Sequence, residues 1–218
     1  MKGVIFDLDG VLADSHPAHF RAWKRLLDSI GKPIQDRDVD FILEGRKRRE
    51  ILEHFLGALS DQQLEEYGRQ KEAFFLEESK NIETIAGVRE LLQILALASI
   101  PLAVASCGTR NRVNDLLERL DLRHYFQAVI TGDDVKEGKP DPSIFLLASE
   151  CYGIAPRDSL CFEDSVSGVK AAKSAGMRCL GVAKGGRGAL LLEIGADKVV
   201  PDFVHLSLAE LKSLFNSQ

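Results

Sequence analysis

Two aspartates, Asp7 and Asp9, directly follow an apolar run, Gly3–Phe6, that is typical of a buried strand. Gly10 comes next and permits a sharp turn that brings the backbone close to a ligand. In open parallel sheets, ligands bind at the carboxyl ends of the strands. Two carboxylates there can divide the chemistry, because one can attack as a nucleophile while the other moves protons. A simple acidic turn is the alternative for this pattern taken alone.

Two further polar residues occupy comparable positions later in the chain. Ser106 ends the apolar run Leu102–Ala105, and its hydroxyl, together with the following backbone amides, can donate to a phosphate. A serine that only caps a helix is the alternative. Lys139 lies within Gly138–Pro142, ahead of an amphipathic segment, and an exposed loop lysine between turn residues is the alternative there.

A pair of acids, Glu163 and Asp164, follows the apolar run Ser159–Phe162. Paired carboxylates are suited to Mg²⁺, which takes oxygen ligands and keeps several waters. Asp164 also stands where a helix cap would open the helical stretch that follows it. Each feature has an ordinary explanation when taken singly. Their joint occurrence, each at the end of a predicted strand, favours a chemical site.

The pattern of apolar residues predicts an α/β fold with a helical insert. From Gly87 onward, short apolar runs alternate with amphipathic stretches, which indicates a parallel sheet covered on both faces. The expected later strands are Leu102–Ala105, Ala128–Ile130, Ser159–Phe162, Cys179–Val182 and Lys198–Val200. The expected helices between them are Gly87–Leu97, Thr109–Leu120, Pro142–Tyr152, Ser165–Ala175 and Gly188–Ile194.

Between the first strand and this alternating region, the sequence predicts only helices. Four segments carry helical spacing without strand alternation: His16–Ile30, Asp36–Leu43, Arg46–Leu59 and Asp61–Ser79. We therefore expect a core formed by residues 1–14 and 82–218, and a four-helix cap formed by residues 15–81. Hinges are expected near Ala13–His16 and Asn81–Ala86.

The motif Asp7-Leu8-Asp9-Gly10, with the later strand-end residues, resembles the haloacid dehalogenase superfamily, subfamily I with a helical cap. The resemblance covers essentially the whole chain and implies a Rossmann-like core. It implies that Asp7 is a nucleophile that becomes an aspartyl phosphate and that Asp9 is the general acid/base. Members that cleave haloalkanoates lack the second aspartate, so Asp9 implies phosphate monoesters as substrates.

The same resemblance assigns roles to the other strand-end residues. Ser106 and Lys139 would hold the phosphoryl oxygens, with Lys139 also neutralising the charge of the nucleophile. Mg²⁺ is the implied cofactor. Its implied ligands are the Asp7 carboxylate, the Asp9 backbone carbonyl and Asp164, with Glu163 acting through a metal-bound water.

The cap resembles that of the β-phosphoglucomutase branch. The resemblance rests on His19 within His19–Lys24, on Gly45 with Arg48, and on Lys71. In that branch the matching histidine couples substrate binding to cap closure, the arginine grips the distal phosphate, and the lysine contacts the sugar. A guanidinium suits phosphate because it binds in a fork. A histidine packed against Trp23 is the alternative for His19.

Three positions depart from the mutase pattern. The residue before Arg48 is Lys47 where the mutase signature has a serine. After Ser106, Gly108 replaces a serine and Arg110 replaces an asparagine that contacts phosphate in the branch. All three changes touch the substrate pocket, and Gly108 and Arg110 stay candidate substrate contacts.

We therefore expect Mg²⁺-dependent phosphoryl transfer from a small phosphate monoester, a sugar phosphate, with hydrolysis preferred as the outcome. The first alternative is β-phosphoglucomutase activity, which converts β-glucose 1-phosphate to glucose 6-phosphate. The minor alternative is a non-catalytic regulator that binds a sugar phosphate. The partner expected in each case is a small phosphorylated metabolite.

The bulk properties exclude other classes. A net charge of −5 over 218 residues does not suggest a nucleic-acid partner. No apolar run approaches the roughly 18 residues that a membrane helix needs. A strand starts almost at the first residue, and the four cysteines form no CxxC pair, so we expect reduced thiols and a cytoplasmic protein. A monomer or weak dimer is expected.

Overall fold

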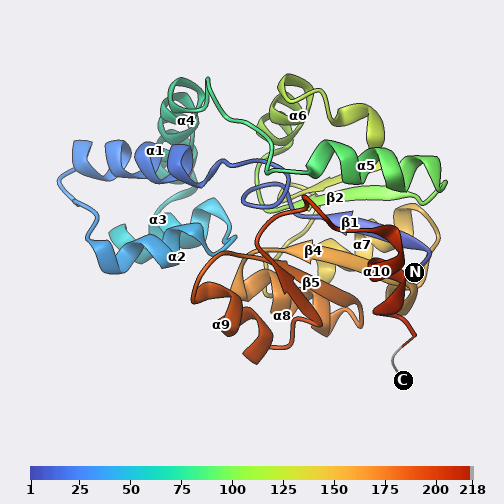
Figure 1. Cartoon of the computed structure of the whole chain (residues 1–218). Helices are drawn as coiled ribbons and strands as arrows, with labels where there is room; N and C mark the ends of the chain where they lie inside the picture. Colours follow the sequence, from blue (N-terminus) through green and yellow to red (C-terminus); the bar gives the residue numbers. More distant parts are fainter. Residues whose placement is uncertain (217–218) are drawn as a thin grey trace.

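The strand that precedes Asp7 lies in the middle of a parallel sheet (Figure 1). The computed structural model describes residues 1–216, and within them six strands pair in the order β3-β2-β1-β4-β5-β6. The strands are β1 (Gly3–Phe6), β2 (Leu102–Ser106), β3 (Ala128–Thr131), β4 (Ser159–Glu163), β5 (Arg178–Val182) and β6 (Lys198–Val200). Because the chain passes from β3 back to the far side of β1, the strand order reverses at β1. Such a switch point is where parallel sheets bind ligands.

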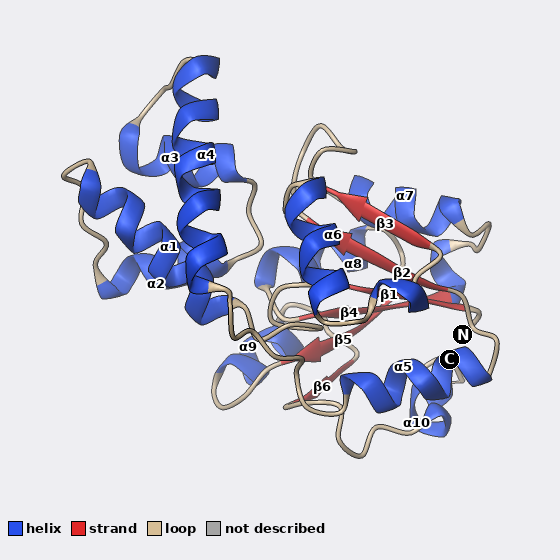
Figure 2. Ribbon diagram, turned by 90° about the horizontal axis from the view of Figure 1, so that it is seen from above, coloured by secondary structure: helices blue, strands red, loops and turns tan. Residues whose placement is uncertain are grey.

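Alternate side chains of β1 enter two separate apolar cores. Val4 and Phe6 lie in one core and Ile5 in the other, and all three are fully buried. This is why the strand is apolar at every position and does not alternate. Helices cover both faces of the sheet (Figure 2). They are α5 (Val88–Leu97), α6 (Arg110–Arg119) and α10 (Leu208–Ser213) on one face, and α7 (Ser143–Cys151), α8 (Val166–Ser174) and α9 (Arg187–Glu193) on the other.

The helical insert stands beside the carboxyl ends of the strands (Figure 1). Its helices are α1 (His16–Ser29), α2 (Val39–Leu43), α3 (Arg48–Leu56) and α4 (Asp61–Glu78), with a 3₁₀ turn at Asp36–Asp38 ahead of α2. The insert has an apolar core of its own, which includes Trp23, Leu26 and Leu52. A reciprocal cap starts α4, because Ser60 accepts from the backbone N–H of Gln63 and the Gln63 side chain accepts from the backbone N–H of Ser60.

The predicted strands and helices agree with the structure to within one or two residues, with two exceptions in the insert. The helix expected over Asp36–Leu43 begins as a 3₁₀ turn, so α2 starts only at Val39. The helix expected over Arg46–Leu59 is shorter, Arg48–Leu56, because glycines with positive φ flank it. Gly45 has φ 69° and Gly57 has φ 78°, a conformation that ends helices and that other residues rarely adopt. The sequence prediction also missed α10 and the 3₁₀ turns at Arg123–Tyr125 and Pro156–Asp158.

The two segments that join insert and core run antiparallel to each other. The backbone N–H of Asp14 donates to the carbonyl of Glu83 at 2.9 Å, and that of Ile85 donates to the carbonyl of Leu12 at 3.1 Å. Paired linkers let an insert tilt as a unit on its core. The division into residues 1–14 with 82–218 and residues 15–81 remains our proposed domain boundary.

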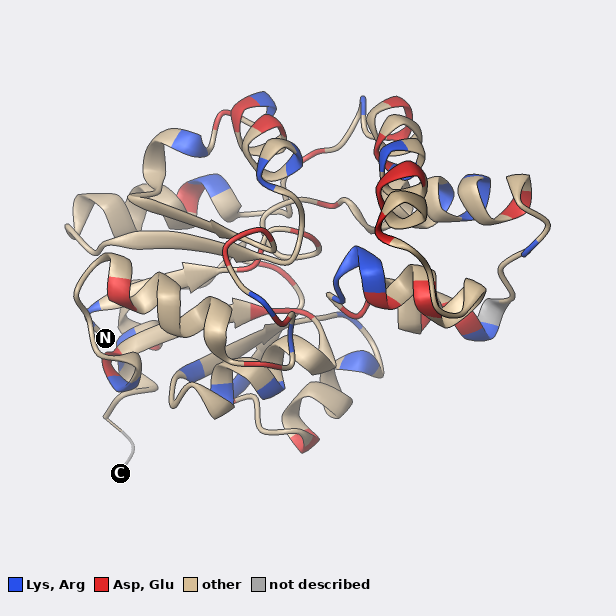
Figure 3. Cartoon of the chain, turned by 180° about the vertical axis from the view of Figure 1, so that it is seen from behind, with Lys and Arg blue, Asp and Glu red and all other residues tan. Residues whose placement is uncertain are grey.

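Basic and acidic residues alternate along the ribbon of both the core and the insert (Figure 3). None of the helices within residues 1–216 combines the length and the apolar character that crossing a bilayer requires.

Candidate active site

Lys139 joins the ends of three neighbouring strands. Its ammonium lies 2.5 Å from Asp7 Oδ1, 2.5 Å from Glu163 Oε1 and 3.0 Å from the carbonyl oxygen of Ala105. Only 1% of the lysine is exposed. Burial by itself would lower the pKa of Lys139, but the two carboxylates outweigh this and raise the pKa well above its usual value. The lysine is therefore a fixed positive charge beside Asp7, which differs from the exposed loop lysine considered as an alternative.

Glu163 is held rigidly by the start of α8. Its Oε2 accepts from the backbone N–H groups of Asp164 and Ser165, at 2.9 and 3.0 Å, and from the Ser165 hydroxyl at 2.9 Å. The carboxylate lies so close to Gly168 that a Cβ there would come within 1.9 Å of Glu163 Cδ. With Lys139 on the other oxygen, Glu163 is fully engaged, so it is better placed to act indirectly on a metal than to ligate one.

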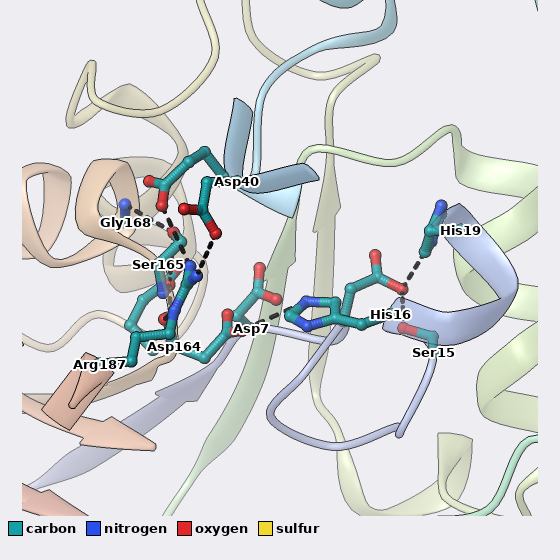
Figure 4. Close-up of polar contacts among 12 residues, drawn as sticks. Asp7, Ser15, His16, His19, Asp40, Asp164, Ser165, Gly168 and Arg187 are labelled. Carbon is teal, nitrogen blue, oxygen red and sulfur yellow. Dashed lines mark hydrogen bonds and ion pairs between the residues drawn. The ribbon is translucent and has the colours of Figure 1, made fainter. Parts of the chain in front are cut away.

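Asp7 and Asp164 are buried carboxyls whose surroundings supply too little positive charge to favour ionisation. Burial raises the pKa of Asp7 well above its usual value, because Lys139 offsets this only in part and Glu163 adds to it. Burial, followed by the charge of Glu163, likewise raises the pKa of Asp164. His16 Nε2 lies 3.2 Å from Asp164 Oδ2 (Figure 4). Gly10 leaves room for this arrangement, because a Cβ there would lie 2.3 Å from Asp164 Oδ2.

These residues fit the divalent cation that the sequence predicts. Two buried carboxyls that resist ionisation would be stabilised in their charged forms by a cation between them. Among residues 1–216, no three His, Cys, Asp or Glu side chains group closely enough to hold a metal by themselves. Two carboxylates, with the backbone carbonyl that the family resemblance implies, suit Mg²⁺, which completes its shell with water or substrate oxygens.

Asp9 is surrounded by donors. Its Oδ1 accepts from the Ser15 hydroxyl at 2.6 Å and lies 3.1 Å from His19 Nε2. Arg112 forms a fork on the carboxylate, with one nitrogen 3.0 Å from Oδ1 and the other 2.8 Å from Oδ2. Burial alone would raise the pKa of Asp9, but Arg112 and His19 together lower it well below its usual value. The two aspartates of the motif therefore have opposite environments.

His19 and Lys71 form the cap side of the cavity. Lys71 Nζ lies 3.2 Å from His19 Nδ1 and 4.6 Å from the centre of the Phe75 ring, on which the imidazole also stacks. Burial and the charge of Lys71 lower the pKa of His19 to about 3. Burial lowers the pKa of Lys71 to about 8. His19 is thus linked to Asp9 on one nitrogen and to Lys71 on the other, beyond the simple packing against Trp23 considered as an alternative.

The loop after β2 contributes Ser106 and Gly108. Ser106 is 1% exposed, lines the cavity, and accepts from the backbone N–H of Gly108 at 3.2 Å. A Cβ on Gly108 would come within 1.9 Å of the Arg112 guanidinium. The glycine that departs from the mutase pattern is therefore the space into which Arg112 fits.

Arg110 does not reach the cavity, in contrast to the sequence prediction. Its guanidinium pairs with Asp134 instead, and its backbone N–H donates to Asp133 at 2.8 Å. Arg112, two residues later, lines the cavity and was missed. One signal for it exists in the sequence. Arg112 falls on the face of α6 otherwise formed by buried Val113 and Leu116, where a charged residue requires a partner.

Arg48 lines the cavity, and its guanidinium packs on Gly68 of α4, where a Cβ would come within 2.4 Å of Arg48 Cζ. Arg46 lines the same cavity and also lies over the Phe41 ring, whereas Arg49 pairs with Asp61 on the surface. Of the predicted substrate contacts, the structure gathers His19, Arg48, Lys71 and Gly108 around one cavity together with the strand-end residues.

Glu44 connects the cap to the core beside this cavity. Its Oε2 accepts from the backbone N–H groups of Val166 and Ser167 at the start of α8, at 3.1 and 3.3 Å. Its Oε1 lies 3.0 Å from Arg187, which itself approaches Asp40 of the cap (Figure 4). A second connection comes from Lys47, whose ammonium donates to the carbonyl of Val135 at 2.6 Å. The cavity is therefore covered by a cap that is held at its rim.

Strand-end carboxylates under a helical cap define a class of capped α/β enzymes. A family model described as haloacid dehalogenase-like hydrolase matches residues 4–182, and the chain belongs to this family. It is 40% identical over 207 residues to a phosphorylated carbohydrates phosphatase of Thermotoga maritima, covering 92% of this chain and 94% of that protein. It is 36% identical over 217 residues to a β-phosphoglucomutase of Bacillus subtilis, covering 95% and 92%.

A solved structure gives the same result. The crystal structure of a β-phosphoglucomutase from Clostridium difficile superposes with a TM-score of 0.89 at 25% identity, covering 99% of this chain and 97% of that one. The predicted family, its β-phosphoglucomutase-like branch and the α/β fold class are confirmed. The protein is an enzyme of the haloacid dehalogenase type, a phosphatase or a phosphoglucomutase.

Proposed function

We propose that this enzyme transfers the phosphoryl group of a small sugar phosphate to Asp7 and then to water, with Mg²⁺ as cofactor. The observation that carries the proposal is the contrast between the two aspartates of the motif. Asp7 faces the fixed charge of Lys139, whereas Asp9 faces the cap through Ser15 and His19. This arrangement separates a nucleophile from a proton carrier.

In the first half-reaction, an oxygen of Asp7 forms a bond to phosphorus as the bond from phosphorus to the sugar oxygen breaks. The sugar oxygen takes a proton from Asp9 as it leaves. In the second half-reaction, water attacks the phosphorus and gives a proton to Asp9, which restores the Asp7 carboxylate and releases phosphate. Ser106 and Lys139 donate to the phosphoryl oxygens throughout and stabilise a loose transition state.

Asp7, Asp164 and the backbone carbonyl of Asp9 would hold Mg²⁺. Glu163 would act on the cation indirectly, through a water molecule. When bound, the cation would supply positive charge that offsets the negative charge of the nucleophile and the phosphoryl group. Lys139 cannot substitute for it, because its single charge is already shared between Asp7 and Glu163.

For substrate recognition we propose His19, Lys71, Arg48 and the space beside Gly108. Arg110 is left out, because its guanidinium pairs with Asp134. The names of the relatives support a phosphorylated carbohydrate, since one is a phosphorylated carbohydrates phosphatase and another is a fructose-1-phosphate phosphatase of Escherichia coli. The changes at Lys47 and Gly108 relative to the mutase pattern favour hydrolysis. A cytoplasmic location and a monomer or weak dimer stay predictions.

β-Phosphoglucomutase activity is the second candidate. The specific observation in its favour is that His19 and Lys71 contact each other on the cap while Arg48 lines the same cavity. A mutase would let a sugar hydroxyl take the phosphoryl group from Asp7 in place of water. A regulator that binds sugar phosphate without turnover is the minor candidate.

Phosphorus NMR distinguishes the three candidate functions: hydrolase, mutase and non-catalytic regulator. The enzyme is mixed with β-glucose 1-phosphate, Mg²⁺ and a trace of glucose 1,6-bisphosphate, and the spectrum is followed over time. Inorganic phosphate as the product supports the hydrolase. Glucose 6-phosphate without comparable inorganic phosphate would show a mutase. If every member of a panel of sugar phosphates binds tightly and none is turned over, the protein is a regulator.

A further inference from the structure

Lys47 reaches from the cap into the core loop that leads to Lys139. Its ammonium donates to the backbone carbonyls of Val135, at 2.6 Å, and of Lys136, at 2.9 Å. No backbone N–H in the described part of the chain donates to either carbonyl, so the cap supplies their partner. The aliphatic stem of Lys47 lies over Gly138, where a Cβ would come within 2.8 Å of Lys47 Cγ. The loop is therefore shaped to receive this side chain.

The connection between α2 and α3 contacts two core loops at once, with charges of opposite sign. Glu44, at its start, accepts from backbone N–H groups at the beginning of α8, just after Glu163 and Asp164. Lys47, at its end, donates to carbonyls in the loop before Lys139. Each charge thus faces the backbone dipoles of opposite sign. These contacts join the cap to the two core segments that carry the strand-end residues of the cavity.

We propose that Lys47 holds the cap closed over the cavity, so that closure does not require a second anionic group on the substrate. This inference rests on the proposed function and extends its substrates to monophosphates with an uncharged remainder. A substrate with two phosphate groups can itself bridge Lys139 in the core and Arg48 in the cap. A monophosphate leaves Arg48 without a phosphate, so a charge of the protein must join the cap to the core.

The length of the side chain at this position decides whether the contact exists. A serine, which the mutase pattern has in place of Lys47, is too short to reach the carbonyls that the ammonium contacts. Lys47 is a positioning residue, because it acts on the reaction through the cap and through the loop before Lys139. Its removal should therefore change both the access to the cavity and the choice among substrates.

Alkylation of Cys107 measures closure in the absence of substrate. Cys107 lines the cavity, whereas Cys151 is exposed at the end of α7 on the core. The ligand-free enzyme is treated with iodoacetamide at one fixed pH, and the alkylation rate of each cysteine is followed by peptide mass spectrometry. The rate for Cys107 is divided by the rate for Cys151, which corrects for the reagent. Lys47→Ser is the test variant, and because serine is a preferred N-cap residue, it should preserve α3.

Lys47→Ser should raise this rate ratio by about tenfold, because losing a hydrogen bond to a charged group shifts an equilibrium by about that factor. Lys47→Arg keeps the charge and can donate to both carbonyls, so it should stay close to wild type. Lys32→Met removes an exposed lysine of the cap and should match wild type. An unchanged ratio in Lys47→Ser would overturn the proposal. If Lys47→Ser does not fold, Lys47→Met keeps the stem over Gly138 and takes its place.

Turnover separates an effect on closure from a local effect on Lys139. The readout is kcat/KM for glucose 6-phosphate divided by kcat/KM for glucose 1,6-bisphosphate, both followed as phosphate release. Lys47→Ser should lower this quotient by about threefold or more, because the bisphosphate can bridge to Arg48 without help from Lys47. An equal loss with both substrates would overturn the proposal, since Lys47 would then act on Lys139 alone.

The proposed function is tested separately in the same experiments. Wild-type enzyme that releases phosphate from neither substrate would refute the phosphatase function. The alkylation ratio needs no turnover, so its failure to rise in Lys47→Ser would refute only the role of Lys47.

Discussion

Lys71 is expected to destabilise the folded protein at neutral pH, so replacing it with methionine should stabilise the fold. The ammonium is buried against Phe75 and Trp23, and its nearest carboxylate oxygen, on Glu72, is 3.6 Å away. Burial lowers the pKa of Lys71 from 10.5 to about 8. A lowered pKa for a lysine means that the charged form is less stable in the folded state than in the unfolded state.

The pKa shift sets the size of the effect. At about 1.4 kcal/mol per pKa unit, keeping Lys71 charged costs the folded state about 3 kcal/mol. Methionine removes this cost and fits the apolar surroundings. It also removes the contacts of the ammonium with the rings of Phe75 and Trp23, which are worth about 1 kcal/mol or somewhat less each. We expect Lys71→Met to raise the free energy of unfolding by about 1–2 kcal/mol at pH 7, a rise in Tm of about 2–8 °C.

The sign of the pH dependence follows from the two pKa values. Below pH 8, Lys71 is protonated in both the folded and the unfolded state, and the full cost is present. Between pH 8 and pH 10.5 the folded protein has lost this proton while the unfolded chain retains it, so wild-type stability rises relative to the variant. The wild type regains about 3 kcal/mol over this range, so the advantage of Lys71→Met should vanish and then reverse as the pH approaches 10.5.

Urea unfolding of both proteins at pH 7 and near pH 10 measures the difference. Lys24→Met, at an exposed position of the same cap domain where Lys24 pairs with Asp28, is the matched control and should stay within about 0.5 kcal/mol of wild type. The reasoning is refuted if Lys71→Met is less stable than wild type at pH 7. It is also refuted if the difference between the two proteins does not change with pH. Either result would mean that the cavity compensates the Lys71 charge in full.

Three further predictions concern the core and the rim of the cap. Gly168→Ala places a Cβ against the Glu163 carboxylate and should cost about 1–3 kcal/mol in urea unfolding together with most of the activity; full activity would show that the carboxylate can move aside. Glu44→Gln weakens the contact with the start of α8 and should raise both the KM for sugar phosphates and the rate of amide hydrogen exchange in the cap linkers. Glu65→Gln, at an exposed position of the cap, is the control and should change neither quantity. Chelation by EDTA should abolish turnover until Mg²⁺ is restored, and Asp164→Asn should need at least about tenfold more Mg²⁺, so an unchanged requirement would exclude Asp164 as a ligand.

The positions of the strand-end residues were predictable because parallel strands deliver their carboxyl ends to one edge of a sheet. Once apolar runs located the strands, Asp7, Ser106 and Glu163 had to meet there. Lys139 was predictable as part of this group only because the resemblance to the family gives it a role there. No periodicity in the sequence carries this information, since the lysine comes from a loop.

The long-range contacts around the cavity were not predictable in the same way. Arg112 and Asp9 are 103 positions apart, and Glu44 lies 122 positions from Val166, so neither pair leaves a local pattern. The motif resemblance points to Arg110 alone, because it counts positions along the chain. Which of two nearby arginines turns inward is decided by packing, here by the space that Gly108 leaves.

Asp7 should carry the phosphoryl group during turnover, and trapping that group tests the proposed mechanism most directly. The enzyme is mixed with radiolabelled substrate and Mg²⁺, quenched in acid within the first turnover, digested, and analysed by mass spectrometry. We expect a labelled peptide phosphorylated at Asp7, which disappears on a chase with unlabelled substrate and is absent from Asp7→Asn. Full turnover by Asp7→Asn, or a transient label on any residue other than Asp7, would contradict it.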